Sequence, residues 1–227
     1  MLRFYFTILI AAISGLAGYA QQMPQISNFM HNQLVYNPAS AGMHPTQLNA
    51  NLVTRFQWSS VTGAPITNMF WADYRFEGKN MAIGININRD QLGANKMTDL
   101  LANYSYYIPL SHKWKLSMGL RAGTSSRQFD INNLERIWDD NDPIVAQAGF
   151  NYFEPVIGTG FQLSSRNTYI GISAPNLLNQ DKYNIYNNKN KGFLSKSRDY
   201  MLLGGHVIKL NDSYSLQPNL RVLYYPG

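Results

Sequence analysis

The chain of 227 residues contains no cysteine, and it contains only four histidines. The missing cysteines exclude a disulfide framework, a thiol nucleophile and a cysteine metal site. The histidines, at positions 31, 44, 112 and 206, never pair at the spacings that bind metal. Beyond the N-terminus, no stretch approaches the roughly 18 consecutive apolar residues of a membrane-spanning helix. We therefore expect no metal, no cofactor and no transmembrane helix.

Charge of either sign is sparse. The net charge is +6, and no run of five basic residues occurs, which argues against nucleic acid as a partner.

No serine lies in a Gly-x-Ser-x-Gly elbow, and Asp73 with Arg75 fits an ion-pair network better than an acid–base pair. The acidic run 139–142 could bind Ca²⁺, but it lacks the EF-hand glycine and distal glutamate, so a solvated loop is favoured. The sequence therefore predicts no enzyme.

Alternation of apolar residues with small or polar residues is abundant. Between Lys113 and Gly123, one face carries Trp114, Leu116, Met118, Leu120 and Ala122, and the other carries lysine, serine, glycine and arginine. A period of two indicates a β-strand, because successive side chains point to opposite faces. A strand of about ten residues with one apolar face fits a strand of a membrane-spanning barrel.

The same pattern recurs along the chain and predicts an all-β fold, an antiparallel transmembrane β-barrel of the outer membrane. We expect about nine strands, and a tenth if 124–131 pairs; they span 47–56, 66–76, 81–88, 98–108, 113–123, 154–163, 167–174, 198–208 and 213–224. Short turns alternate with longer connections at 57–65, 89–97, 130–153 and 175–197. In such barrels the short turns face the periplasm and the long loops face outward.

Three segments are expected. Residues 1–20 resemble a secretory signal peptide, with Arg3 before an apolar core and small residues before a cleavage site at Gln21. Residues 21–46 lack a sustained period, and we expect an irregular segment in the barrel lumen or at its periplasmic mouth. Residues 47–227 form the barrel, which we expect to be incompletely closed, with C-terminal strands missing. An open edge would be costly in hydrocarbon, where its backbone groups find no partner.

Several blocks of sequence occur in an order that resembles the PorP/SprF family, outer-membrane barrel components of the type IX secretion and gliding machinery of Bacteroidota. Residues 24–27 and Asn32 precede the first main block, 141–143 and 224–227 match later positions, and the other matching residues are Tyr36, Asn37, Pro38, Ala39, Ala41, Gly42, Arg55, Gln57, Trp58, Gly63, Ala64, Pro65, Pro175, Asn176, Leu177 and Leu178. The resemblance extends over residues 21–227. It implies a barrel of about fourteen strands, of which this chain holds roughly two thirds.

The resemblance also implies a function. Such a protein would lie in outer-membrane lipid, contact the periplasmic ring and other type IX secretion components, and assist exported proteins that carry C-terminal secretion domains. We expect a docking scaffold of this kind. The alternative is an outer-membrane channel for hydrophobic small molecules, of the fatty-acid transporter type. A hydrophobic lumen would favour this alternative.

Two local questions stay open at this point. The block from Asn37 to Gly42 is either a plain turn, set by Asn, Pro and Gly, or a plug contact or partner-binding element. Most aromatic residues are predicted to lie on the lipid face as interfacial anchors. Trp71 falls on the opposite face to Phe70, so it is the exception and a candidate for stacking on a ligand.

Overall fold

The structure is a computed structural model, and it describes residues 28–129, 150–178 and 199–224. The predicted signal peptide at 1–20 and the first residues of the irregular segment lie outside these ranges. The acidic run at 139–142, the block at 141–143 and the last three residues of the chain also lie outside them.

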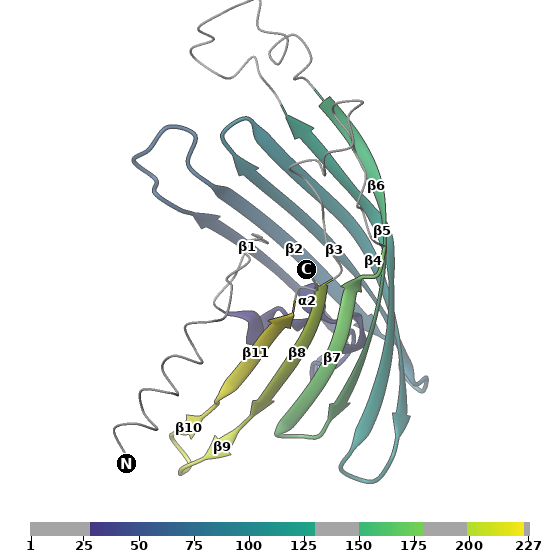
Figure 1. Ribbon diagram of the computed structural model, residues 1–227. Helices are drawn as coiled ribbons and strands as arrows, with labels where there is room; N and C mark the ends of the chain where they lie inside the picture. Colours follow the sequence, from purple (N-terminus) through teal and green to yellow (C-terminus); the bar gives the residue numbers. More distant parts are fainter. Residues whose placement is uncertain (1–27, 130–149, 179–198, 225–227) are drawn as a thin grey trace, which may run out of the picture.

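One antiparallel sheet of nine strands forms most of the described molecule (Figure 1), and a two-stranded hairpin is attached to it. The sheet follows chain order, β1-β2-β3-β4-β5-β6-β7-β8-β11, and β9 pairs with β10. The strands are β1 (Leu48–Phe56), β2 (Ile66–Arg75), β3 (Met81–Leu92), β4 (Asn95–Pro109), β5 (Lys115–Phe129), β6 (Phe150–Ser164), β7 (Thr168–Asn176), β8 (Asp199–His206), β9 (Ile208–Lys209), β10 (Ser215–Leu216) and β11 (Asn219–Tyr224).

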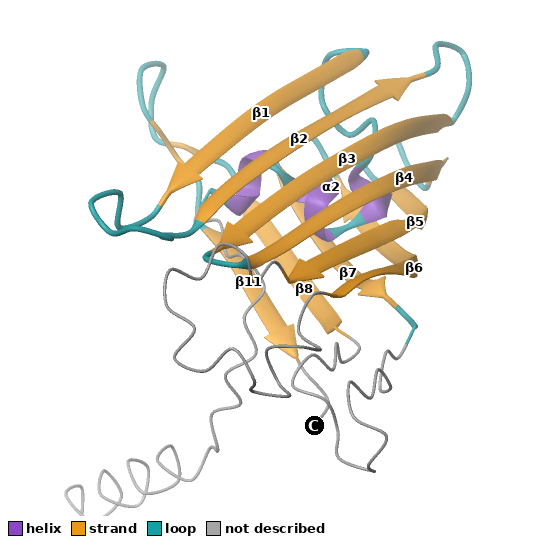
Figure 2. Ribbon diagram, turned by 90° about the horizontal axis from the view of Figure 1, so that it is seen from above, coloured by secondary structure: helices purple, strands orange, loops and turns teal. Residues whose placement is uncertain are grey.

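The sheet curves into an open half-barrel (Figures 1 and 2). Its edges are β1 and β11, and neither edge pairs with a further strand in the part of the chain that the structure describes. The predicted antiparallel β-fold with an unclosed sheet is thus confirmed. Among the described helices, none is long and apolar enough to cross a membrane.

The two faces of the sheet differ as the alternation predicts. On β3, Ile83, Ile85 and Ile87 are 47%, 44% and 39% exposed on the convex face, whereas Ala82 and Asn86 are fully buried on the concave face. The register places Ile85 between Ala72 of β2 and Ala102 of β4, so apolar positions form continuous rows across strands. The convex face is the one suited to lipid.

Some strand boundaries differ from the prediction. The connection expected at 89–97 is instead a two-residue turn between β3 and β4, in which Gly93 adopts a positive φ of 56°. Glycine tolerates that conformation, so the two strands continue almost to the turn. Residues 124–129 extend β5 and form no tenth strand. The expected strand 213–224 divides into β10 and β11 before and after Pro218, which has no N–H to donate to a ladder.

The convex face yields a first prediction. Ile85→Arg should prevent assembly into the membrane, because an arginine at the midplane of such a barrel costs roughly 2–4 kcal/mol. Leu110→Arg, the same kind of change at a position 56% exposed in the turn between β4 and β5, should be tolerated. Membrane fractionation and heat-modifiable gel mobility measure both. Equal behaviour of the two variants would show that the convex face does not lie in lipid.

Candidate functional site

The N-terminal segment lies inside the curve of the sheet (Figure 2). It contains three short helical turns, η1 (Phe29–His31), α2 (Gln33–Tyr36) and η2 (Pro38–Ser40). Residues 36–42 are buried without exception. We call residues 33–42 the plug segment, and its contacts with the concave face define the candidate site.

Asn37 is the central polar contact of the plug segment. Its Oδ1 accepts a hydrogen bond from the backbone N of Ala39 at 2.9 Å, which caps η2. Its Nδ2 donates to the carbonyl of Phe161 at 3.2 Å and to Oε1 of Gln162 at 3.4 Å, both on β6. One fully buried amide therefore shapes the turn and binds it to a strand more than 120 residues away in sequence.

Glycines of the sheet make room for this approach. A Cβ added to Gly119 of β5 would collide with the backbone of Pro38 and Ala39. A Cβ on Gly160 of β6 would collide with the Asn37 side chain, and one on Gly171 of β7 would lie 2.7 Å from Asn37 Nδ2. The concave face therefore carries a path, free of side chains, in which the backbone of the plug segment lies.

Serine and aspartate side chains of the sheet satisfy the buried backbone of the plug segment. Ser173 donates to the carbonyl of Tyr36 at 2.9 Å, and Ser105 donates to the carbonyl of Ala41 at 2.8 Å. The carboxylate of Asp73 accepts from the backbone N of Gly42 at 2.7 Å. Gly42 itself has a φ of 72°, which favours glycine. Buried backbone groups need such partners, so these contacts fix the register of the segment.

Arg121 of β5 holds the other end of the plug segment. Its guanidinium donates to the carbonyl of Val35 at 2.9 Å, to the carbonyl of Leu34, and to Oδ1 of Asn103 at 2.8 Å. Only 4% of Arg121 is exposed. A planar fork with several donors suits this site, because it bonds two consecutive carbonyls and a strand side chain together.

Apolar contacts complete the packing. Trp71, 2% exposed, packs in a cluster with Leu34, Ala41, Met69, Ala82 and Tyr107. A second cluster contains Tyr36, Met201 and Leu203, and the guanidinium of Arg221 lies 4.8 Å above the Tyr36 ring. Trp71 is thus a core residue beneath the plug segment, and the hypothesis that it stacks on a ligand has no support in this position.

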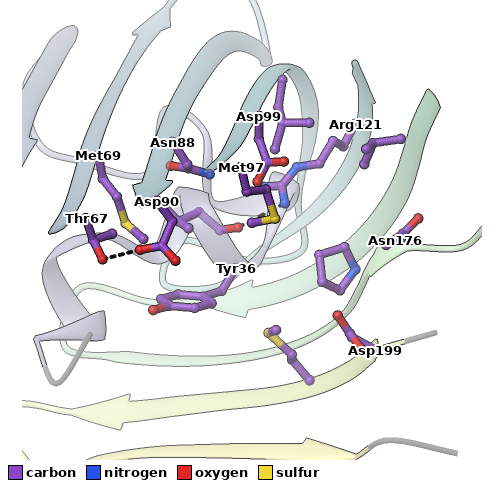
Figure 3. Close-up of a pocket in the computed structure, with 15 residues that line it drawn as sticks. Tyr36, Thr67, Met69, Asn88, Asp90, Met97, Asp99, Arg121, Asn176 and Asp199 are labelled. Carbon is purple, nitrogen blue, oxygen red and sulfur yellow. Dashed lines mark hydrogen bonds between the residues drawn. The ribbon is translucent and has the colours of Figure 1, made fainter. Parts of the chain in front are cut away.

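A small cavity of about 50 Å³ lies beside the plug segment (Figure 3). Most of its lining is apolar, and its polar lining residues are Thr67, Asn88, Asp90, Asp99, Arg121, Asn176 and Asp199. Thr67 donates to Asp90, and the Asp99 carboxylate lies beside the Arg121 guanidinium in Figure 3. Within the described ranges, no group of three or more histidines or acids is placed to hold a metal ion. At about 50 Å³, the cavity is small for an alkyl chain.

The structure brings some of the motif residues together and separates others. Tyr36, Pro175 and Asn176 line the same cavity, and Leu177 and Leu178 directly follow β7. The block from Arg55 to Pro65 instead forms the end of β1 and the loop to β2. There Trp58 is 67% exposed with a φ of 53°, and Gly63 has a φ of 77°. The motif residues therefore lie in two regions. One is the plug segment together with the end of β7, and the other is the loop from β1 to β2.

Sequence reasoning missed the residues that receive the plug segment. Gly119, Gly160, Ser105, Ser173 and Arg121 all belong to the inner rows of predicted strands. The small size of the glycines and serines, and the arginine at an inward position of its strand, are visible in the sequence. What they contact is not, because residues 33–42 carry no period that assigns them to a face.

Comparison with known protein families identifies a match over most of the chain. The family model described as "Type IX secretion system membrane protein PorP/SprF" matches residues 18–227. No curated protein and no solved structure matches the chain.

The glycine path yields a prediction on stability. Gly119→Ala should destabilise the fold by about 1–3 kcal/mol, because the new methyl group forces the plug backbone away from β5. Gly204→Ala is the matched control, since the nearest atom to its Cβ would be the Tyr169 carbonyl oxygen at 3.8 Å. Urea unfolding followed by heat-modifiable mobility measures the difference. If both variants unfold at the same urea concentration, the plug segment does not lie on Gly119.

Arg121 yields a second stability prediction. Arg121→Met should cost at least about 3 kcal/mol, because it removes several buried hydrogen bonds from a charged donor. The control is Arg89→Met, at an exposed position of β3, which should change stability by less than about 0.5 kcal/mol. Unfolding midpoints in urea compare the two variants. A stable Arg121→Met protein would contradict the assigned role of the guanidinium.

Proposed function

Because the chain belongs to the PorP/SprF family of type IX secretion system membrane proteins, we propose that it is a docking scaffold of that system in the outer membrane. The observation that carries the proposal is the filled concave face. The half-barrel is occupied by its own plug segment, which bonds to β2, β4, β5, β6 and β7. A packed interior of this kind favours a rigid anchor whose two ends are available to partners.

The two ends of the sheet differ in the connections between their strands. The turns at 76–80, 110–114 and 165–167 lie at one end, together with the β9–β10 hairpin, and they are short. By the usual orientation of outer-membrane barrels this end faces the periplasm, where ring components of the secretion system would bind. The longer connections, at 57–65, 130–149 and 177–198, join strands at the opposite end, where the two-residue turn at Gly93 also lies. That end would meet exported proteins with C-terminal secretion domains.

The alternative function, a channel for hydrophobic small molecules, has less support. Asn86, Asn103, Ser105, Ser117, Arg121 and Gln162 are all buried on the concave face. An alkyl chain among them would desolvate polar groups without offering hydrogen bonds, which is unfavourable. The cavity beside the plug segment, about 50 Å³, is also small for such a chain. The family description names a membrane component of a secretion system and no reaction, so the proposed role is not enzymatic.

The scaffold proposal is tested in the native host. Deletion of the gene should abolish surface display of a protein that carries a C-terminal secretion domain, and the affinity-tagged full chain should restore display. Purification of that tagged chain should recover other type IX secretion components. Surface immunofluorescence of the exported protein and mass spectrometry of the purified complex give the two readouts.

Uptake of a labelled fatty acid by the same strains serves as the control measurement. The scaffold proposal predicts unchanged uptake after deletion. Normal surface display combined with lost fatty-acid uptake would contradict it and would favour the channel.

A further inference from the structure

A second, larger cavity opens on the concave side at the short-turn end of the sheet, the lower end in Figure 1. Its volume is about 590 Å³, within the range of about 300–1,000 Å³ typical of ligand sites. Its wall combines the residues that follow the plug segment with the turns from β4 to β5 and from β6 to β7.

The lining of this cavity is basic. Arg75, Lys113, Lys115 and Arg166 contribute four cationic side chains, His44 and His112 add two imidazoles, and no aspartate or glutamate lines it. Lys113, Lys115 and Arg166 are exposed, so their ammonium and guanidinium groups are accessible. Cations gathered from three separate segments in one hollow focus a positive potential there.

The acids near the cavity are fewer than its cations. Asp73 does not line the cavity; it is 3% exposed, and its carboxylate accepts from the backbone of Gly42 and from the side chain of Asn49. Glu77 lines an adjoining hollow together with Lys79, and Arg75 and Lys115 line both hollows, so this one carboxylate lies among three cations. Arg75 donates to the carbonyls of His44 and Pro45 at 3.3 and 3.2 Å, contacts that position its guanidinium without cancelling its charge.

We propose that this cavity, which we call the basic mouth, binds an acidic peptide segment of a protein partner. The inference rests on the proposed docking function and specifies the chemistry of the partner. Carboxylates would pair with Lys113, Lys115 and Arg166, and Met43, Pro45 and Tyr107 in the same lining offer apolar contacts to a chain. The mixture of cations and apolar surface fits a peptide better than a bare inorganic anion.

The location of the basic mouth argues for a ligand from the aqueous side. Lys115 lies on the same face of β5 as the buried Ser117, whereas Met118 and Leu120 point to the convex face. A lipid headgroup would approach from that convex side. A peptide segment that enters from the periplasm would meet the concave side directly.

The test measures peptide binding to the purified full chain in detergent by fluorescence anisotropy. The probe is a fluorescein-labelled octapeptide of alternating Asp and Gly, compared with the Lys–Gly octapeptide. The acidic peptide should bind, and its affinity should fall as the NaCl concentration is raised. Lys113→Gln with Arg166→Gln should reduce its affinity about tenfold. The charge-matched control, Arg89→Gln with Lys209→Gln, changes exposed residues outside the cavity and should alter the affinity less than about twofold.

Several results would overturn the inference. Equal loss in both double variants would indicate attraction to net charge alone. Displacement of the peptide by an equal concentration of inorganic phosphate would assign the mouth to small anions. If the chain binds phosphatidylglycerol vesicles but not the peptide, and Lys113→Gln with Arg166→Gln abolishes vesicle binding, the basic mouth is a lipid site. Absence of peptide binding with an intact export phenotype would refute this inference and leave the docking function standing, whereas normal display in the deletion strain would refute the docking function itself.

Discussion

The need to hydrogen-bond a backbone buried against a sheet is the constraint on which this structure depends. Residues 36–42 are shielded from solvent, so each of their peptide groups must find a partner in the protein. Asn37 caps its own turn and reaches β6, while Ser105 and Ser173 serve the neighbouring carbonyls. These bonds form only at close approach, and close approach requires glycine at 119 and 160. The small residues and the polar side chains of the inner face therefore act together to hold the plug segment.

The same packing supports the proposed separation of membrane anchoring from partner recognition. The convex face presents isoleucine, leucine and tyrosine, and the concave face is covered by the chain's own segment. The chemistry that remains accessible is at the ends of the sheet, where the short-turn end gathers Arg75, Lys113, Lys115 and Arg166. A family of secretion-system membrane proteins fits such a division, because a component that binds partners at its ends needs a stiff body between them.

The sequence predicted the strands well and the plug contacts poorly, for physical reasons. Alternation on β3 identified Ile85 and Asn86 as outward and inward because a lipid-facing strand obeys a strict period of two. The turn at Gly93 was missed because polar residues extend both strands past the apolar band, where the period weakens. The bond from Asn37 to Phe161 joins segments that only the completed sheet brings together. The motif around Asn37 contains residues of the plug segment, while the strand residues that they contact lie outside the motif.

Site-specific cysteine labelling tests the central claim, that the plug segment lies bound in the concave face, most directly. The native chain has no cysteine, so a single introduced thiol reports one position. Ser40→Cys, at a site 4% exposed, should react with a maleimide only after unfolding. Ser60→Cys, in the exposed loop between β1 and β2, should react readily in the folded protein. Rapid labelling at both positions in the folded, membrane-embedded chain would contradict the account.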